Sequence, residues 1–260
     1  MFCKTGCYPN LEVGIFVTTN QSSQDKNTPQ AFNVLELQLL SEDIYRVMLE
    51  CVHGDVPAYR AGQYLEVMLD GEGMAFSIAS APVSDQKTLE LHIQKLPGKP
   101  NSEKLFSALE KGAIEVRMPK GKCCIDVIPD KPMVFIAAGT GFAQMKSMIE
   151  FALASDHKDI HFYWGARSPE GFYMPSLPVQ WSSQLNYHPV VSDANKEDGW
   201  QGRQGLLFEA VIDDKNILTD SEVYISDSPQ MVYATYDAMV AEGFDPDAFH
   251  SDVFEYAPRS

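Results

Sequence analysis

Residues 133–143 carry the sequence MVFIAAGTGFA, and this stretch decides the fold. Residues 133–138 form a continuous apolar run, which is typical of a parallel strand buried on both faces. Gly139-Thr140-Gly141 follows this run, and a helical pattern extends from Phe142 to Ala154. A strand, a glycine turn and a helix in this order predict the start of a doubly wound α/β domain, in which backbone N–H groups can face a phosphate.

The glycine turn departs from the usual dinucleotide-binding fingerprint. Gln144 replaces the third glycine of G-x-G-x-x-G, and the next predicted strand, residues 160–166, is followed by Arg167 instead of an acidic residue. No Gly-Lys-Ser/Thr follows, which excludes a P-loop. These residues alone fit a nucleotide-binding turn and an ordinary strand–helix turn equally well. Arg167 could contact a ribose or a 2′-phosphate, or it could be an ordinary surface arginine.

Strand and helix patterns alternate through the rest of the chain. They predict a doubly wound parallel sheet over residues 130–260. The predicted strands after residue 166 are 187–192, 222–226 and 249–254, and the predicted helices are 206–212 and 230–243.

The preceding part of the chain, residues 31–129, has a different pattern. Short strand-like segments are separated by Gly, Pro, Asp and Ser, and one short helix is predicted, capped by Ser102 and stopped by Gly112. This pattern predicts a small antiparallel β-barrel, with the domain boundary near Pro129–Pro132. Residues 1–30 are polar at their end, and we expect a flexible extension there. The predicted strands are 33–40, 45–51, 63–69, 75–80, 88–94, 114–118 and 122–127.

Composition limits the classes of partner. The 260 residues include 20 Lys and Arg against 36 Asp and Glu, a net charge of −16, which disfavours nucleic acid and membrane surfaces. The acidic C-terminal quarter fits a solvated surface or a docking face for a basic redox partner protein. Five cysteines suit a reducing cytoplasm, and we expect no secretory signal, no membrane span and no metal site.

Eight short motifs, in order over residues 33–256, resemble those of the ferredoxin–NADP⁺ reductase superfamily. They are most similar to the bacterial NAD(P)H:flavin oxidoreductases, including those that supply reduced flavin to luciferase. The resemblance implies a six-stranded flavin-binding β-barrel followed by a nicotinamide-nucleotide domain. The motifs are RAGQY (60–64), FSIASAP (76–82), LELHI (89–93), MPKG (118–121), AAGTGFA (137–143), FYWGAR (162–167), SDSPQMVY (226–233) and DVFEY (252–256).

The resemblance also implies a flavin site in the barrel. Phe76, Ser77 and Ile78 would lie along the isoalloxazine ring, with the Ser77 hydroxyl near the reactive N5 edge. Main-chain groups of His92 and Ile93 would flank the ring. Asn101 and Ser102 would stand where the helix on the phosphate side begins.

For the nicotinamide coenzyme, NADH or NADPH, the resemblance implies a site in the second domain. Gly139, Thr140 and Gly141 would receive the nucleotide, and Arg167 and Tyr173 would contact its ribose or adenosine end. Ser226 would stand beside the nicotinamide, so Ser77 and Ser226 are the candidate catalytic residues. Phe254 and Tyr256 would form a C-terminal aromatic wall.

Two residues depart from the family pattern. Met74 stands where the family has an arginine that grips the flavin phosphate, and Asp227 replaces a glycine beside the nicotinamide. The expected activity is hydride transfer from NAD(P)H to N5 of riboflavin, FMN or FAD, with release of the reduced flavin. One alternative retains its flavin and passes electrons to an oxygenase or an iron–sulfur carrier. Another is a non-catalytic nucleotide-binding descendant.

Overall fold

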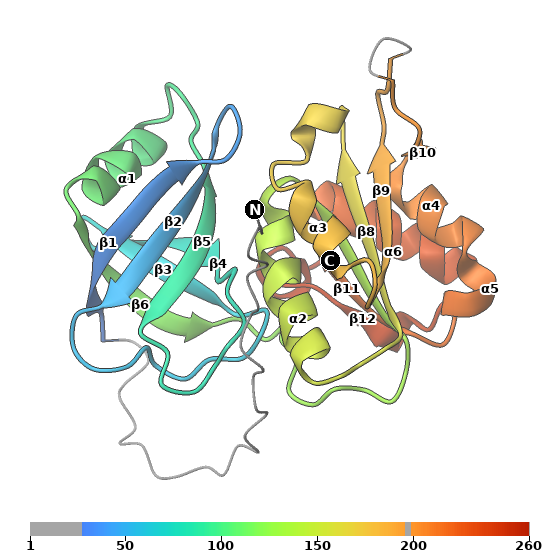
Figure 1. The fold of residues 1–260 in the computed structure, drawn as a ribbon, viewed down its shortest axis with the longest axis horizontal. Helices are drawn as coiled ribbons and strands as arrows, with labels where there is room; N and C mark the ends of the chain where they lie inside the picture. The colour runs from blue at the N-terminus through green and yellow to red at the C-terminus, as the bar shows by residue number, and fades with distance from the viewer. Residues whose placement is uncertain (1–27, 196–198, 260) are drawn as a thin grey trace, which may run out of the picture.

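The computed structural model describes residues 28–195 and 199–259, which form two sheets side by side (Figure 1). The first sheet is antiparallel, and its strands lie in the order β4-β3-β6-β1-β2-β5. A bridge between Ile78 and Leu91 joins its two edges, so the sheet closes into a barrel. Its strands are β1 (Gln30–Leu39), β2 (Ile44–Cys51), β3 (Tyr64–Leu69), β4 (Glu72–Ser77), β5 (Thr88–Gln94) and β6 (Ala113–Lys120).

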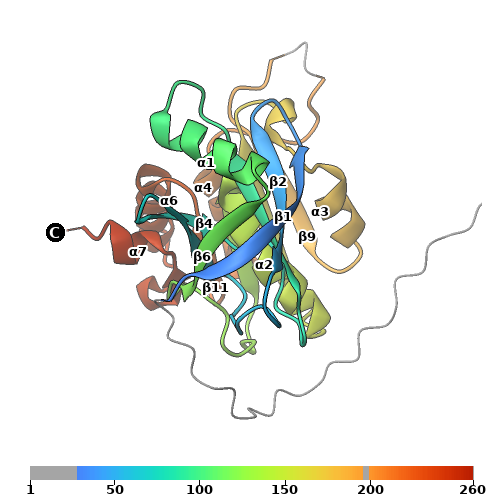
Figure 2. The ribbon, with the colours of Figure 1, turned by 90° about the vertical axis from the view of Figure 1, so that its left-hand side faces the viewer.

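Alternating side chains of these strands fill the barrel. In β5, Leu89, Leu91 and Ile93 are buried inside it, as the two-residue period of a strand dictates. Helix α1 (Pro100–Glu110) covers one end and buries Leu105 and Phe106 there (Figure 2).

The second sheet is parallel throughout, in the order β10-β9-β8-β7-β11-β12. Helix α2 covers the face that is turned toward the barrel, and α4 and α6 cover the other (Figure 1). The strands are β7 (Met133–Ala138), β8 (Ile160–Ala166), β9 (Asn186–Val191), β10 (Arg203–Gln204), β11 (Glu222–Ser226) and β12 (Phe249–His250). The helices are α2 (Phe142–Ala154), α3 (Ser176–Trp181), α4 (Leu207–Asp213), α5 (Lys215–Leu218), α6 (Pro229–Ala241) and α7 (Val253–Tyr256).

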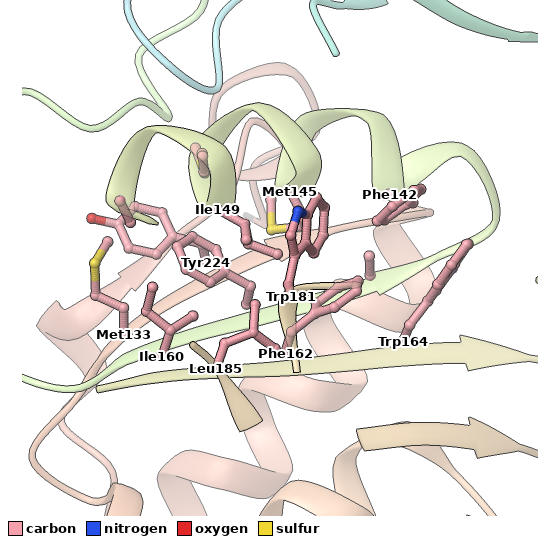
Figure 3. Packing of buried hydrophobic residues seen from close by; sticks show 14 of the residues in the cluster. Met133, Phe142, Met145, Ile149, Ile160, Phe162, Trp164, Trp181, Leu185 and Tyr224 are labelled. Carbon is pink, nitrogen blue, oxygen red and sulfur yellow. The ribbon is translucent and has the colours of Figure 1, made fainter. Parts of the chain in front are cut away.

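The apolar run that opens β7 supplies both faces of this sheet. Phe135 packs on the α2 side, and Val134 and Ile136 pack on the other side. On the α2 side, Phe142 stacks on Trp164 with ring centroids 4.0 Å apart (Figure 3). The side chains of Met133–Ala137 are fully buried, which explains why no polar residue interrupts this run.

The structure confirms the predicted fold class, a barrel followed by a doubly wound sheet, and corrects three local predictions. Residues 122–127 form no strand but part of the connection from β6 to β7. Ser102 does not cap α1; it lies inside the helix, and its hydroxyl accepts from the Leu96 N–H at 2.9 Å. The predicted strand at 249–254 keeps only two strand residues before α7 begins.

The boundary near residue 130 lies in the same connection, and the division into domains stays a prediction. The predicted N-terminal extension lies almost entirely outside the described residues. Within residues 28–195 and 199–259, no helix combines the length and apolar character that a membrane span requires.

Candidate functional site

The glycine turn after β7 is held against the end of β11. A Cβ on Gly141 would lie 1.9 Å from the Ser226 carbonyl oxygen, so only glycine allows this approach. Gly139 has φ +52°, a left-handed conformation that also favours glycine, but its surroundings are open. The turn therefore places the start of α2 beside the carboxyl end of β11, where ligands of doubly wound sheets bind.

A groove of about 830 Å³ runs along this carboxyl edge, and we call it the nucleotide groove. The barrel forms one of its walls through the turn between β1 and β2 and through Gln94. Its ionisable lining consists of one cation, Arg167, and four carboxylates, Glu42, Asp43, Glu170 and Asp227. The remaining lining residues are Ser41, Ile44, Gln94, Ala138, Gly139, Gly165, Ala166, Ser168, Gly171, Val190, Ser192, Gly205, Leu206, Leu207, Ser228 and Met231.

A second space of about 380 Å³, the junction cavity, lies between the barrel and the parallel sheet. Asp227 lines both it and the nucleotide groove, so the two spaces adjoin there. Within residues 28–195 and 199–259, its lining includes several aromatic side chains and no Lys, Arg or His. The lining residues are Tyr64, Ala75, Phe76, Ser77, Gln144, Ser226, Asp227, Ser251, Asp252, Val253 and Tyr256.

Two serines line the junction cavity, one from the barrel and one from the parallel sheet. Ser77 ends β4 of the barrel, and Ser226 ends β11 of the parallel sheet. In the described part of the chain, neither hydroxyl has a hydrogen-bond partner. Both are therefore free to bind polar atoms of a ligand. The structure thus brings together the two residues that were predicted as catalytic from sequence.

Asp252 is a candidate that sequence reasoning missed. Burial raises the pKa of its carboxyl to about 6, although the Gln144 side chain donates to Oδ2 at 2.8 Å. A carboxyl with this pKa exchanges a proton near neutral pH, as a general acid must. It belongs to the quoted DVFEY motif, but only the two aromatic residues of that motif were singled out.

Asp227 places a second carboxyl at the meeting point of the two spaces. Burial raises its pKa above the ordinary range, and the Ser228 backbone N–H partly opposes this effect. Asp227 therefore lines both spaces at the position where the family pattern has a glycine, and its effect on coenzyme binding stays a prediction.

Several predicted flavin residues lie outside the junction cavity. Ile78 and Ile93 are buried in the barrel core, so only their backbone groups can serve a ligand. Asn101 is exposed on α1, and Ser102 is buried there, away from both lined spaces. Met74 packs against the barrel core, which accounts for an apolar residue at this position.

His92 and Tyr173 form a buried pair instead of lining a ligand space. The Glu90 carboxylate lies 2.8 Å from His92 Nε2, and the Tyr173 hydroxyl lies 2.9 Å from Nδ1. Burial lowers the pKa of His92, so the ring is neutral at pH 7; it donates from Nε2 and accepts from Tyr173. Tyr173 therefore links the two halves of the molecule, and the geometry does not support its predicted contact with a ribose.

Among the residues predicted for the nucleotide and for the aromatic wall, some line one of the two spaces and others do not. Gly139 and Arg167 line the nucleotide groove, but Thr140 does not. Tyr256 lines the junction cavity, whereas Phe254 packs against Tyr233 and Tyr236. Of the two residues of the predicted aromatic wall, Tyr256 is the one that lines this cavity.

A buried ionic cluster holds α2 against the barrel. Lys146 of α2 lies 3.1 Å from both Glu90 of β5 and Glu150, and it donates to the Ala79 carbonyl at 3.2 Å. Burial raises the pKa of Glu90, but hydrogen bonds from His92 and Lys146 outweigh it and lower this pKa to about 2. The cluster is separate from both ligand spaces and stabilises the contact between the two halves.

The described residues contain no group of three His, Cys, Asp or Glu side chains that could hold a metal ion. The site is therefore one of hydroxyls, carboxyls, aromatic rings and a glycine turn.

Comparison with known proteins identifies relatives of this chain. Residues 135–237 match the oxidoreductase NAD-binding domain family. The chain is 33% identical to an NAD(P)H-flavin reductase of Aliivibrio fischeri over 221 residues, which are 80% of this chain and 91% of that protein. It is 29% identical to reductase component 1 of the terephthalate 1,2-dioxygenase of Comamonas sp, over 85% of this chain and 66% of that protein.

The chain spans only 65% or 66% of the length of other curated relatives. Among solved structures, the ferredoxin reductase in carbazole 1,9a-dioxygenase aligns with a TM-score of 0.76 at 20% identity. The alignment covers 88% of this chain and 72% of that one, and it shows the same fold.

Proposed function

Because the chain belongs to the NAD(P)H-flavin reductases of the ferredoxin–NADP⁺ reductase superfamily, we propose that it passes a hydride from NADH or NADPH to N5 of a flavin and releases the reduced flavin. The junction cavity carries this proposal. It joins a hydroxyl from the barrel and one from the parallel sheet in a space that adjoins the nucleotide groove. Two ring systems placed there, one from each side, would meet face to face.

The residues of the site fit a flavin and a nicotinamide. Phe76 and Tyr256 offer aromatic surface for a flat ring, and Ser77 offers a hydroxyl for its polar edge. Ser226 and Asp227 stand where the nicotinamide would enter from the nucleotide groove. Gly139 and the start of α2 suit the phosphates of the coenzyme.

When bound, the flavin accepts the hydride, which brings two electrons and one proton, and a second proton completes its reduction. The chain orients the two rings and excludes water, which is the main source of catalysis in such a reaction. Asp252 lines the cavity and is protonated below a pH of about 6, so it is the side chain that we assign to hold the second proton.

The charge of the cavity supports release of the flavin after reduction. Among the residues that the structure describes, no cation lines the junction cavity, and Met74, which replaces the family's arginine, packs on the barrel core. A flavin phosphate would therefore gain no charge-assisted hydrogen bond there. We infer that riboflavin binds nearly as well as FMN and that the flavin exchanges as a substrate.

A reductase that keeps its flavin and serves a protein partner is the second candidate, because a relative of this chain is named as a dioxygenase reductase component. The purified protein distinguishes the two. A yellow protein that holds its flavin through gel filtration would favour the second candidate, and a colourless protein that needs added flavin would favour the first.

Anaerobic mixing of the purified protein with NADH and riboflavin, FMN or FAD tests the proposal directly. We expect the absorbance of the oxidised flavin to disappear only when protein, coenzyme and flavin are all present. If the folded protein binds the coenzyme but bleaches none of the three flavins, the proposed function is wrong and a non-catalytic binding protein remains.

A further inference from the structure

Gln144 is a buried polar residue in the first turn of α2, and its side chain is only 2% exposed. It stands at the position where the dinucleotide fingerprint has its third glycine. A glutamine buried here requires partners, because an unpaired buried amide destabilises a protein. Its partners lie outside its own helix.

The side-chain amide of Gln144 has two acceptors at short distance and a third, the Cys123 carbonyl, at 3.5 Å. Nε2 lies 2.8 Å from the Gly62 carbonyl of the barrel and 2.8 Å from Asp252 Oδ2. A carbonyl can only accept, so Nε2, not Oε1, must face this side. The two shortest contacts take one N–H each, so Asp252 Oδ2 receives a hydrogen bond.

The other carboxyl oxygen of Asp252 is different. Oδ1 is buried and has no hydrogen-bond partner among the described residues. It lies beside Gly121, where a Cβ would stand 3.0 Å from Oδ1 and 2.8 Å from the Tyr64 ring. Because Oδ2 already accepts from Gln144, a proton on this carboxyl belongs on Oδ1.

We propose that Gln144 is a positioning residue for flavin reduction: its amide ties Asp252 Oδ2 to the Gly62 carbonyl of the barrel and so fixes the orientation of the carboxyl that holds the transferable proton. The catalytic part of this inference rests on the proposed function. The hydrogen bonds join the C-terminal segment, α2 and the barrel at one amide group. The geometry of the proton donor is thereby tied to the geometry of the barrel that holds the flavin.

The ionisable groups around Asp252 do not stabilise its carboxylate form. Tyr64 faces it from β3, Cys123 from the connection after β6, and Glu255 and Tyr256 from α7. Asp227, after β11, lines the same cavity. None of these groups is a cation, and the Glu255 carboxylate disfavours a charge on Asp252. The hydrogen bond from Gln144 is therefore the main side-chain interaction that favours the carboxylate form.

The ligand-free wild-type protein provides the first test. Carbon-13 NMR of the aspartate carboxyls, with Asp252→Asn to identify the resonance, follows protonation of Asp252. Nitrogen-15 NMR follows the side-chain amide of Gln144, identified with Gln144→Leu. We expect both resonances to titrate with one shared midpoint near pH 6. An amide resonance of Gln144 that stays constant while Asp252 titrates would overturn the proposal. The titration itself uses the wild-type protein, and the variants serve only to assign the two resonances.

The variant Gln144→Leu provides the second test, because it removes the donor and keeps the side-chain volume similar. We expect the Asp252 midpoint to rise by about one pH unit, since a charge-assisted hydrogen bond is lost. The pH profile of flavin reduction should shift equally, and the shift should vanish in the Asp252→Asn background. The matched control is Gln180→Leu, on the exposed face of α3. It should change neither the Asp252 midpoint nor the pH profile of flavin reduction.

These outcomes separate the inference from the proposed function. A folded Gln144→Leu protein with an unchanged Asp252 midpoint would overturn the positioning role. Coupled titration of Asp252 and Gln144 in a protein that bleaches no flavin would instead leave the pairing intact and refute the proposed function, and with it the catalytic role of the pair.

Discussion

At the residue scale, the Ser77 hydroxyl belongs to the barrel wall of the junction cavity and has no protein partner in the described chain. We expect Ser77→Ala to raise the KM for flavin several-fold, because a lost ligand hydrogen bond costs about 0.5–1.5 kcal/mol. The KM for NADH should stay nearly unchanged, since Ser77 does not line the nucleotide groove.

Steady-state kinetics of Ser77→Ala, with the exposed Ser84→Ala as the matched control, checks this expectation. An increase in the KM for NADH without one for flavin would place Ser77 on the coenzyme side and contradict the site.

Asp252 makes a second prediction at this scale, about stability. Its pKa is about 6 in the folded protein against an ordinary 3.8, so burying its charge destabilises the fold. This penalty is absent below pH 3.8, grows as the pH rises through 6, and is then constant. We expect Asp252→Asn to raise the free energy of unfolding by about 1–2 kcal/mol at pH 8 while slowing flavin reduction.

Denaturant unfolding of the wild type and Asp252→Asn at pH 8 and pH 4 measures the difference. The increase in the free energy of unfolding caused by Asp252→Asn should fall toward zero at pH 4. A gain that is equal at both pH values would show that the charge of Asp252 is not its cause.

At the element scale, the turn between β7 and α2 depends on two glycines for different reasons. Gly141 needs space, since a Cβ would lie 1.9 Å from the Ser226 carbonyl, and Gly139 needs a left-handed backbone in open surroundings. We expect Gly141→Ala to destabilise the protein by more than about 3 kcal/mol, because backbone atoms would have to move apart. Gly139→Ala should cost only about 1–2 kcal/mol.

Thermal unfolding of the two variants side by side provides the check. Equal losses would mean that the contact of the turn with β11 does not determine the position of α2. The close approach is a tertiary fact, since Gly141 has an ordinary helical φ of −57° and no local signal distinguishes it from other glycines.

The long elements were predictable because their patterns follow from local rules. Helix α2 was predicted at its observed bounds, since an apolar strand, a glycine turn and a helical period follow one another directly. Residues 122–127 carried a strand-like pattern but have no strand to pair with. Cys123 and Ile125 are buried instead against the layer around α2. Tertiary packing overrode the local preference there.

At the scale of the whole molecule, the barrel and the parallel sheet together create the charge of the nucleotide groove. The barrel contributes Glu42 and Asp43, and the parallel-sheet half contributes Glu170 and Asp227. Arg167 is the one cation of this lining among the residues that the structure describes. NADPH carries an additional phosphate with a charge of about −1.5 to −2. We expect kcat/KM to favour NADH over NADPH by about tenfold, because like charges in an interface oppose binding.

Kinetics with both coenzymes at low and high salt tests this preference, which salt should weaken. The double variant Glu42→Gln and Glu170→Gln should reduce the preference for NADH over NADPH. Arg167→Ala should instead weaken binding of both coenzymes. A preference for NADPH that Arg167→Ala abolishes would show instead that Arg167 grips the 2′-phosphate.

The sequence by itself determined the two-part architecture and the class of chemistry. The periods of its apolar residues predicted a barrel and a doubly wound sheet, and its ordered motifs placed Ser77, Ser226 and Asp227 near one site. Only the tertiary structure decided which residues share that site. Asp252 and Gln144 line the junction cavity, whereas Tyr173 and Phe254 are packed against other side chains. The physical reason is that side-chain period is a local property, whereas burial, hydrogen-bond partners and pKa depend on which distant segments pack together.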